Sequence, residues 1–473
     1  MPVKIGLFSV GLDAYWPQFD GLKDRLLRYN QSIADGLQAR GVEIVNLGLI
    51  DTAEKALAAG HQFRQADVEM IFLHAATYAL SSTVLPVVRR SKVPIVILNL
   101  APGPAIDYEL FNRMRDRQQM TGEWLAWCGA CSVPEITNLF QRCRVPFFQV
   151  TGMLEDDPVA WNEIGEWVEA AKVAHVLEHN RLGLMGHYYS GMLDIYSDLT
   201  LQCATFGGHI QMLEVDELAA LRESIAPAEL KARIELFYDV FDIQPDCAPE
   251  EIERCAITSI ALDQLVKKHD LGSMAYFYSG TGNRANETAI ASIILGTSLL
   301  TGRGVPIAGE YEIKNVQAMK IMDAFGAGGS FSEFYAIDFK DDVVLWGHDG
   351  PGHVGIAEGK VRIRPLRVYH GKVSSGLSVE MSVRDGPVTL LSVAESGDGK
   401  LKLLFAEGEC VPGPILEIGN TNSRYRFSTG ARKFVEAWNS NSPPHHCAIG
   451  VGHIGSKLRR LGALLGLETV QVC

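Results

Sequence analysis

The chain has 473 residues, of which 47% are hydrophobic and 21% are charged, so it is long enough to form about two to four folded domains. It carries 43 lysines and arginines against 56 aspartates and glutamates, a formal net charge of −13. This acidic balance argues against nonspecific binding of nucleic acid or of an anionic membrane, and we expect neither partner.

The sequence begins directly with a strand pattern and shows no charged leader, and its longest apolar run is too short to span a bilayer. The nine cysteines are scattered, and their odd number argues against a disulfide framework. We therefore expect a cytoplasmic protein with free thiols.

The first segment, residues 1–178, alternates apolar strands with amphipathic helices. Strands without polar interruption between helices predict a parallel sheet covered on both faces, which is a doubly wound, Rossmann-like α/β domain. The expected strands are 3–10, 42–48, 68–75, 93–100 and 145–152.

One long helix is expected over 118–143, and it contains the motif CGAC at Cys128–Cys131. Such a CxxC pair indicates a redox couple or half of a zinc site, or else two ordinary helix residues. No second CxxC follows in the sequence, which favours the ordinary interpretation.

Residues 179–328 repeat the alternating pattern and predict a second doubly wound α/β domain. Its expected strands are 181–186, 209–215, 273–280 and 305–310, followed by a helix over 312–325.

Residues 329–473 have a different sequence pattern, because short strands are separated by Gly, Asp and Ser. This predicts an antiparallel β-rich domain, a barrel or a sandwich. Its expected elements include strands 361–371, 377–383, 388–395 and 400–409 and a helix over 431–439.

Polar residues at strand ends form the clearest candidate for chemistry. Glu310 ends a strand as a helix begins, where ligand sites gather in open α/β sheets. Glu333 lies in the apolar run SFSEFY, where a buried carboxylate would need a partner. His348 ends another strand, and His445 and His446 precede one. Two Glu and one or two His suit Mn²⁺, Co²⁺ or Ni²⁺, although the sequence alone leaves open that each is an isolated surface or core residue.

A rival motif is SGTGNRA, a GxGxxA pattern at Gly280, Gly282 and Ala285 between a strand and a helix. It is typical of a dinucleotide site, but the next strand lacks the acidic residue that binds the ribose. The alternative is a plain strand-to-helix loop that holds a sugar hydroxyl, and we expect no nucleotide cofactor. His74 and His187 also sit at strand ends, where a structural role or a sugar contact is favoured over metal ligation.

The stretch GEYEIKNVQAMKIMDAFGAGGSFSEFYAIDFKDDVVLWGH, together with PPHH at 443–446, resembles the L-arabinose isomerase family, within the larger L-fucose/L-arabinose isomerase group. In that family a Glu opens the helix, a second Glu lies in an S-F-x-E strand, and a His follows in a turn. A His–His pair near the C-terminus completes the set. The resemblance covers essentially the whole chain, and its domain order is α/β, α/β, β-rich.

The resemblance implies a metal-dependent aldose–ketose isomerase that takes an open-chain sugar, with Mn²⁺ or possibly Co²⁺, Mg²⁺ or Ni²⁺ as cofactor. It implies a homo-oligomer, a hexamer or a tetramer. The implied residues are Glu310, Glu333, His348 and His446 as metal ligands, Glu310, Glu333 and His445 as catalytic groups, and Glu312, Phe331, Asp349, His353 and His187 as substrate contacts.

The chain also departs from the family. Glu312 replaces the usual Asp, and Pro351 in HDGPGH occupies the place of a glutamate that is thought to help in catalysis. The sequence leaves open whether Asp349 or His353 takes over that task. It leaves open the sugar and its stereochemistry too. Alternative functions are an epimerase or isomerase of an unusual sugar, a non-catalytic sugar-binding protein, and an NAD-linked sugar oxidoreductase.

Overall fold

The computed structural model describes residues 2–366 and 375–473, which form two compact units, Met1–His175 and Val176–Cys473. The predicted fold class is confirmed: two parallel α/β sheets precede a C-terminal antiparallel barrel. The predicted domain limits, 1–178, 179–328 and 329–473, stay a prediction. The end of the expected strand 361–371 lies outside the described residues.

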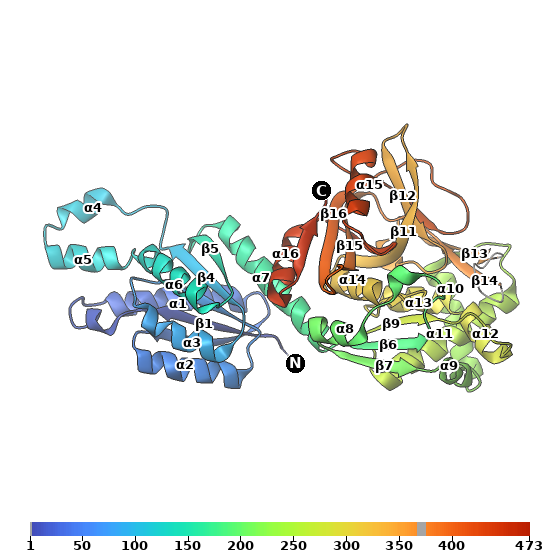
Figure 1. Cartoon of the computed structure of the whole chain (residues 1–473), viewed down its shortest axis with the longest axis horizontal. Coiled ribbons are helices and arrows are strands. Elements are labelled where there is room, and N and C mark those ends of the chain that lie inside the picture. Colours follow the sequence, from blue (N-terminus) through green and yellow to red (C-terminus); the bar gives the residue numbers. More distant parts are fainter. Residues whose placement is uncertain (1, 367–374) are drawn as a thin grey trace. The chain divides into compact units, whose positions relative to one another are not determined.

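The first unit is built on a five-stranded parallel sheet in the order β2-β1-β3-β4-β5 (Figure 1). Strands β1, β3 and β4 are buried almost throughout, as their unbroken apolar sequences predict for a sheet covered on both faces. The strands are β1 (Lys4–Val10), β2 (Glu43–Ile50), β3 (Met70–His74), β4 (Ile95–Ala101) and β5 (Phe147–Met153).

Helices cover both faces of this sheet. Side chains of α2, α3 and α6 share one core with the strands, while α1 packs against Trp161 of α7 through Gly36. The helices are α1 (Leu22–Gln38), α2 (Ala53–Ala66), α3 (Leu85–Ser91), α4 (Tyr108–Arg113), α5 (Arg117–Leu125), α6 (Gly129–Cys143) and α7 (Pro158–Glu178), with 3₁₀ turns η1 (Asp13–Tyr15) and η2 (Ser81–Thr83).

The single helix predicted over 118–143 is wrong, because the chain turns at residues 126–128 between α5 and α6. Thr77 Oγ1 donates a hydrogen bond of 2.7 Å to the carbonyl oxygen of Leu125, a group at the end of α5. Cys128 then serves as the N-cap of α6 and is joined to Cys131 by a disulfide. The expectation that all the cysteines are free thiols is therefore wrong for this pair.

The second unit contains a four-stranded parallel sheet in the order β10-β9-β6-β7. Its strands are β6 (Arg181–Gly186), β7 (His209–Leu213), β9 (Ser273–Phe277) and β10 (Ile307–Ala308). The segments around them are η3 (Leu193–Ile195), α8 (Leu199–Phe206), α9 (Val215–Arg222), α10 (Pro227–Val240), α11 (Pro249–His269), α12 (Arg284–Ala291), α13 (Ile294–Thr301) and α14 (Ile313–Ala324).

The C-terminal part of this unit is a closed antiparallel barrel of six strands in the order β15-β18-β11-β12-β17-β16, with β16 pairing back to β15. The sequence was compatible with either a barrel or a sandwich. The pairing of β15 with β16 closes the sheet and shows that it is a barrel. Its strands are β11 (Gly328–Asp338), β12 (Val343–His348), β15 (Gly386–Glu395), β16 (Leu401–Cys410), β17 (Thr421–Arg426) and β18 (His446–Val451).

Smaller elements flank the barrel. β19 (Glu468–Gln471) adds in parallel to β16, and a three-stranded sheet joins β8 (Phe241–Ile243), β13 (Val361–Leu366) and β14 (Gly376–Glu380). The remaining segments are η4 (Val354–Ile356), α15 (Ala431–Ser440) and α16 (Gly455–Leu465).

Helix α14 is the element that connects the second sheet to the barrel. It packs against β9 and β10 of the sheet and against β11, β15 and β18 of the barrel, and Figure 1 shows it between these two parts. Residues 313–322 are all buried, as expected for a helix enclosed by other elements. The residues just before α14 and just after it are therefore fixed by the core on both sides.

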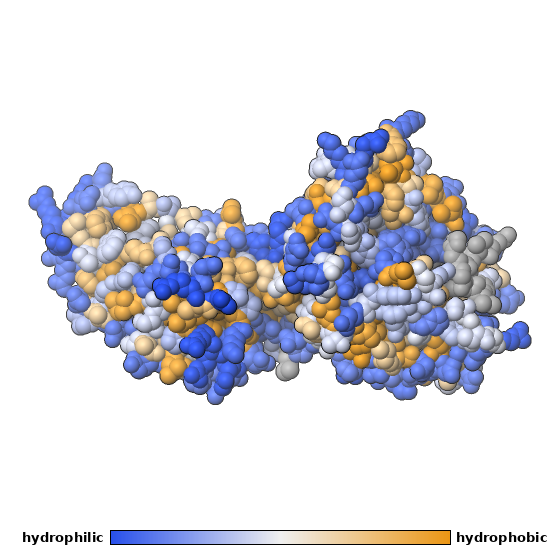
Figure 2. Space-filling model, in the orientation of Figure 1, coloured by the Kyte–Doolittle hydropathy of each residue, from blue (hydrophilic) through white to orange (hydrophobic). Residues whose placement is uncertain are grey.

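The surface mixes polar and apolar side chains. On the face that Figure 2 shows, hydrophobic residues are interspersed among hydrophilic ones on each unit, which is ordinary for a folded protein. Over residues 2–366 and 375–473, no helix is both long and apolar enough to cross a lipid bilayer.

His74 illustrates how a strand-end histidine is used structurally. It is fully buried at the end of β3, and its Nδ1 lies 2.9 Å from Ser9 Oγ, which also accepts a hydrogen bond from Asn30. Burial lowers the pKa of His74 to about 3 from its ordinary 6.5, because the charged ring would lose its hydration. The structure thus favours a core role for this residue.

We expect His74 to destabilise the protein in acid. Below pH 6.5 the unfolded chain takes up a proton at this ring while the folded chain does not until about pH 3, so the free energy of unfolding falls as the pH is lowered. Between pH 7 and pH 5 the contribution is about 2 kcal/mol. Urea unfolding of His74→Asn, which keeps a polar atom for Ser9, should show a smaller loss over this interval than wild type. The exposed His209→Asn should leave the loss unchanged; equal losses in all three proteins would contradict this account.

Candidate metal centre

The candidate site lies where the second sheet meets one end of the barrel. Glu310 follows β10 directly and precedes α14, while His348 ends β12 and His446 begins β18. In the barrel, β11 lies between β12 and β18, and Glu333 of β11 is directly opposite both Gly347 and His446. Strand register therefore brings residues that are far apart in the sequence to one place.

The backbone at Glu310 is held in an unusual conformation. Glu310 and Tyr311 both have positive φ angles, 58° and 64°, which residues other than glycine rarely adopt. Strain of this kind amounts to about 1–3 kcal/mol per residue and persists only where the surroundings enforce it. Here the amide of Tyr311 donates to Tyr276 of β9, and the carbonyl of Glu310 accepts from Tyr189. The turn aims the Glu310 carboxylate at the barrel end.

Glu310 faces three histidines. Its Oε1 lies 3.9 Å from Nε2 of His348, and its Oε2 lies 3.3 Å from Nε2 of His446 and 3.8 Å from Nε2 of His445. Two overlapping groups have ligand atoms within 4.8 Å of one another: Glu310 with His348 and His446, and Glu333 with His445 and His446. His446 belongs to both. The four predicted metal ligands thus gather around His446, although Glu333 falls in the second group.

The polar atoms of this cluster fit a cation. Oε2 of Glu310, Oε2 of Glu312 and both ring nitrogens of His446 are buried, and none has a well-aligned hydrogen-bond partner among residues 2–366 and 375–473. Buried polar atoms in folded proteins are almost always satisfied, so this concentration calls for a partner. Carboxylate oxygens and imidazole nitrogens together suit a divalent transition metal.

The electrostatics of the cluster favour an ionised Glu310 and a charged His446. Burial of Glu310 opposes its ionisation, but the contacts with His445, His446 and His348 outweigh burial and hold its pKa well below the ordinary value. Burial likewise opposes the charge on His446, yet Glu310 and Glu312 raise its pKa to about 9. A proton or a metal ion at this spot would balance the negative charge of Glu310.

Glu312 and Lys314 form a buried layer behind His446. Oε2 of Glu312 lies 3.6 Å from Nδ1 of His446, on the ring edge opposite Glu310. Glu312 also caps α14 by accepting from the amide of Lys314, and it is 0% exposed. A carboxylate behind a ligand histidine fixes the orientation of the ring. The sequence predicted Glu312 as a substrate contact; its position behind the ring instead suits orienting His446.

Phe331 forms the floor of the cluster. Its ring centroid lies 4.3 Å from that of His348 and 4.4 Å from that of His446. Glu333 differs from the expectation drawn from its apolar run, because it is half-buried rather than buried. It faces a cavity of about 360 Å³ whose polar lining includes Glu333, His445 and Asp194 and whose apolar lining includes Phe334 and Trp438.

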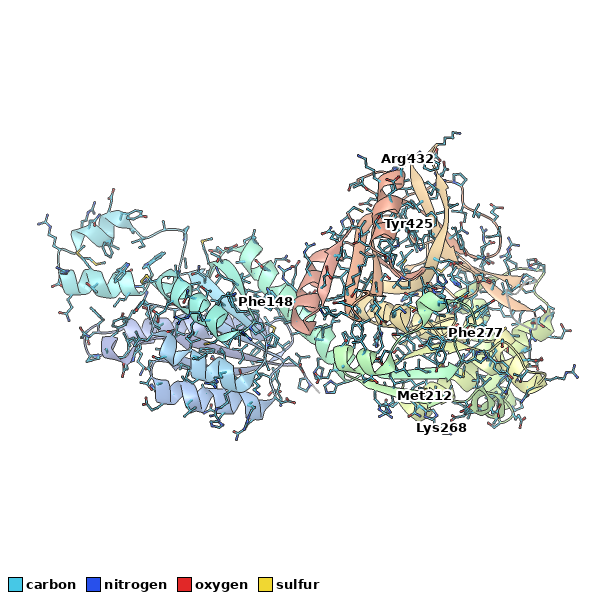
Figure 3. All side chains as sticks on the ribbon, viewed as in Figure 1. Phe148, Met212, Lys268, Phe277, Tyr425 and Arg432 are labelled. Carbon is cyan, nitrogen blue, oxygen red and sulfur yellow. A yellow bond between two sulfur atoms is a disulfide. The ribbon has the colours of Figure 1, made fainter. Side chains whose placement is uncertain are left out.

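The other residues predicted as substrate contacts lie in three different environments. Oδ1 of Asp349 lies 3.4 Å from Nδ1 of His348, beside the cluster. His353 is buried instead, and its Nδ1 accepts from the amide of Gly355 at the start of η4. His187 is exposed at the end of β6, where it contacts the ring of Phe277 (labelled in Figure 3) and lies 3.5 Å from Ser279 Oγ.

The GxGxxA loop makes its own hydrogen bonds. Gly280 and Gly282 have φ angles of 89° and 86°, so glycine is required at both positions. The amide of Gly282 donates to Glu287, and the side chain of Asn283 accepts from two amides at the start of α12. Side chains of the loop thus occupy amides that a phosphate would use.

Asp194 is the residue that sequence reasoning missed. Its Oδ2 lies 2.6 Å from Nδ1 of His445 and accepts from the His445 amide at 2.9 Å. The same segment is anchored by Lys314, whose ammonium donates to the carbonyl oxygens of Asp194 and Tyr196. The only signal in the sequence was an acidic residue in the loop that carries His187.

Comparison with known proteins gives distant relatives. No protein-family profile matches the chain. It is 23% identical over 351 residues to an L-arabinose isomerase of Nocardioides sp., covering 72% of this chain and 68% of that protein. It is 20% identical over 339 residues to an L-arabinose isomerase of Aeromonas salmonicida, covering 70% and 68%.

Among solved structures, a substrate-binding protein of a sugar ABC transport system from Bordetella parapertussis aligns over 69% of this chain and 81% of that chain. Its TM-score is 0.16 at 11% identity, which is too low to bear on fold or function.

In the second unit a parallel α/β sheet and a closed antiparallel barrel carry a Glu/His cluster that is a candidate metal site, and distant homology to L-arabinose isomerases indicates a sugar isomerase-like protein. Distant homology over about 70% of the chain makes it, more particularly, a divergent member of the L-arabinose isomerase family. The predicted family is confirmed. The expected cytoplasmic location and the expected hexamer or tetramer stay predictions.

We expect a divalent cation to stabilise the second unit. A ligand present at a hundred times its Kd and bound only by the folded state adds about 2.7 kcal/mol to the free energy of unfolding. Chelator-treated protein should therefore unfold at a higher urea concentration once Mn²⁺ is restored. His348→Gln should remove most of this gain, because it deletes one ligand nitrogen. His453→Gln, a histidine outside both groups, should retain it, and a full gain in the His348 variant would contradict the assignment.

Proposed function

We propose that the chain is a metal-dependent aldose–ketose isomerase acting on an open-chain sugar. One observation supports this above all: Glu310 and Glu333 approach His446 from two separate elements, and Oε2 of Glu310 and both ring nitrogens of His446 are buried without a well-aligned hydrogen bond. The homology to L-arabinose isomerases supports the same reaction class. The sugar itself is left open, because HDGPGH differs from the family at a catalytic position.

In this proposal Glu310, Glu333, His348 and His446 would hold the metal. Mn²⁺ is favoured, with Co²⁺, Mg²⁺ or Ni²⁺ as alternatives, since the donor set mixes oxygen and nitrogen. When bound, the metal supplies Lewis-acid polarisation of the sugar carbonyl. Glu312 and Phe331 keep the His446 ring in one orientation, the first through Nδ1 and the second through ring packing.

The proton transfer falls to the carboxylates. Isomerisation moves a proton between C1 and C2 of the sugar through an enediol, and a positioned acid/base group contributes about 10²–10⁴-fold. Glu333 is half-buried and lines the cavity, so it can reach a bound sugar. Glu310 stays ionised beside three histidines and acts on the opposite side of the sugar carbons. His445, also in the cavity lining, exchanges a proton with a sugar oxygen.

Asp349 is the better candidate to replace the family glutamate that is absent at Pro351. Its carboxylate lies beside His348 and is partly open to solvent, whereas His353 is buried and engaged with the amide of Gly355. His187 lies at the carboxyl end of the second sheet and contacts the Ser279 loop, which suits binding of a sugar hydroxyl.

A second candidate function is a non-catalytic sugar-binding protein or an epimerase on the same fold. The observation that favours it is Pro351, which is buried and carries no acid/base group where the family has one. Sugar and metal would still bind, because the Glu/His cluster is intact.

A screen of metals and sugars separates these functions. Chelator-treated protein receives Mn²⁺, Co²⁺, Mg²⁺ or no metal, and NMR follows exchange in a panel of tetroses, pentoses, hexoses and deoxysugars. Aldose–ketose exchange that requires metal supports the isomerase and identifies the sugar class. Stabilisation by metal without exchange on any sugar supports the second candidate.

Glu333→Gln should strongly reduce turnover. The amide cannot take the proton from C2, so we expect kcat to fall by about 10²–10⁴-fold, together with weaker metal stabilisation. The exposed Glu358→Gln on the same part of the chain serves as the matched control. A Glu333 variant that binds metal fully and isomerises at the wild-type rate would exclude Glu333 from both roles.

Asp194→Asn should lower kcat by about 10–100-fold while the stabilisation by metal stays unchanged. The amide removes the charge that Asp194 places against Nδ1 of His445, and neither residue is among the four proposed metal ligands, Glu310, Glu333, His348 and His446. Steady-state kinetics and urea unfolding with Mn²⁺ measure the two effects separately. Asp239→Asn, an exposed aspartate on α10, is the control. An unchanged kcat would show that His445 does not depend on Asp194.

A further inference from the structure

The CGAC motif forms a disulfide that the proposed isomerase reaction does not use. Cys128 is bonded to Cys131, while the seven other cysteines are free thiols. Both residues belong to the first unit, whereas every Glu and His of the candidate metal centre belongs to the second. Any activity of the cysteine pair can therefore be tested independently of the metal.

The disulfide spans the first turn of α6. Cys128 is the N-cap residue, and the amide of Cys131 donates to the carbonyl oxygen of Cys128 at 3.3 Å. The start of a helix presents free amides and the positive end of the helix dipole. Both stabilise a thiolate, so cysteines at such positions are reactive in thiol–disulfide exchange.

The two sulfur-bearing residues differ in access to solvent. Cys131 is exposed, while Cys128 is only 3% exposed. An incoming thiolate can therefore reach Cys131, and the sulfur of Cys128 is the leaving group. A leaving thiolate at the N-cap is stabilised by the helix, which favours this direction of attack.

The turn is held in place without the disulfide. A Cβ atom on Gly129 would lie 2.1 Å from the carbonyl oxygen of Ala75, so only glycine allows this close approach. Ser132 Oγ donates to the carbonyl oxygen of Gly129, and Glu135 accepts from the amide of Ser81. Since these contacts remain when the S–S bond opens, reduction need not unfold the helix.

A purely structural role explains little about this bond. A disulfide stabilises chiefly by restricting the unfolded chain, and the effect is smallest for the shortest loops. Here the partners are three residues apart and already share a backbone hydrogen bond. The start of α6 also packs against the loop after β3, at the carboxyl edge of the parallel sheet, where functional sites gather in such folds.

We propose that Cys128 and Cys131 form a thiol–disulfide exchange site that accepts two electrons from a dithiol. A thiolate of the dithiol attacks Sγ of Cys131, and Sγ of Cys128 leaves as a thiolate. The mixed disulfide joins one sulfur of the dithiol to Cys131. The second thiol of the same dithiol then attacks that sulfur, and Sγ of Cys131 leaves. The dithiol becomes a disulfide, and the protein gains two electrons and two protons. The reverse sequence reduces a disulfide substrate and restores the bond between Cys128 and Cys131.

The test equilibrates the native, full-length protein with dithiothreitol and its oxidised form at a series of ratios. An alkylating reagent then blocks all free thiols, and mass spectrometry measures the mass of the peptide that contains both cysteines. We expect the ratio of reduced to oxidised pair to rise tenfold for each tenfold rise in the dithiol-to-disulfide ratio, with an unchanged unfolding midpoint in urea. Cys143, an exposed free thiol, should be labelled at every ratio and serves as the internal control.

Two results would overturn the proposal. A pair that is labelled only after the protein is unfolded would be a structural crosslink, and a pair that is labelled without any dithiol would not be a disulfide. Single variants check the order of attack in the native protein. The remaining thiol of Cys128→Ser should be alkylated at least about tenfold faster than that of Cys131→Ser, because only Cys131 is exposed. Equal rates would refute the assigned order.

Discussion

The contact between Glu310 and His446 is the constraint on which the second unit depends. It joins the end of the parallel sheet to the first residue of a barrel strand, through Oε2 and Nε2 atoms that are 3.3 Å apart. Both groups are ionisable and largely buried, and Glu312 adds a second carboxylate on the other edge of the ring. Separating them would leave buried charge without a partner, which is far less favourable than keeping the cluster together. The fold must therefore bring these side chains close together.

Two features of the backbone place these side chains next to one another. Register in the barrel places Glu333 opposite His446 across β11 and β18, so a slip of one residue would send one of them to the other face. On the sheet side, the positive φ angles of Glu310 and Tyr311 turn the chain from β10 into α14. The buried helix α14 packs on both parts and prevents that turn from relaxing. Its Lys314 also fixes the Asp194 segment, so the same helix positions His445 indirectly.

The elements that follow from local pattern were predictable from the sequence, and those that rest on distant contacts were not. The strands of the two parallel sheets were recognised from their unbroken apolar runs, and the family motifs predicted α14 and indicated Glu310, Glu333, His348 and His446 as site residues. Barrel closure was not decided, because it depends on the pairing of β15 with β16 rather than on any single strand. Asp194 was missed because it is 251 residues away from His445. The break between α5 and α6 was missed because helical periodicity continues through it, and the bond from Thr77 to Leu125 is invisible in the sequence.

The two carboxylates of the cluster lie in unlike environments, and this difference bears on how the proposed reaction divides between them. Glu310 is surrounded by three imidazoles that keep its pKa low, so it holds its negative charge firmly. Glu333 is half-buried at a cavity and is grouped with two of those rings, His445 and His446. Carboxylates whose surroundings differ in this way tend to take different roles, one as a fixed charge and the other in proton transfer. Pro351 removes an acid/base group from this neighbourhood, which leaves more of the proton transfer to Glu333 than a site with an additional glutamate would require.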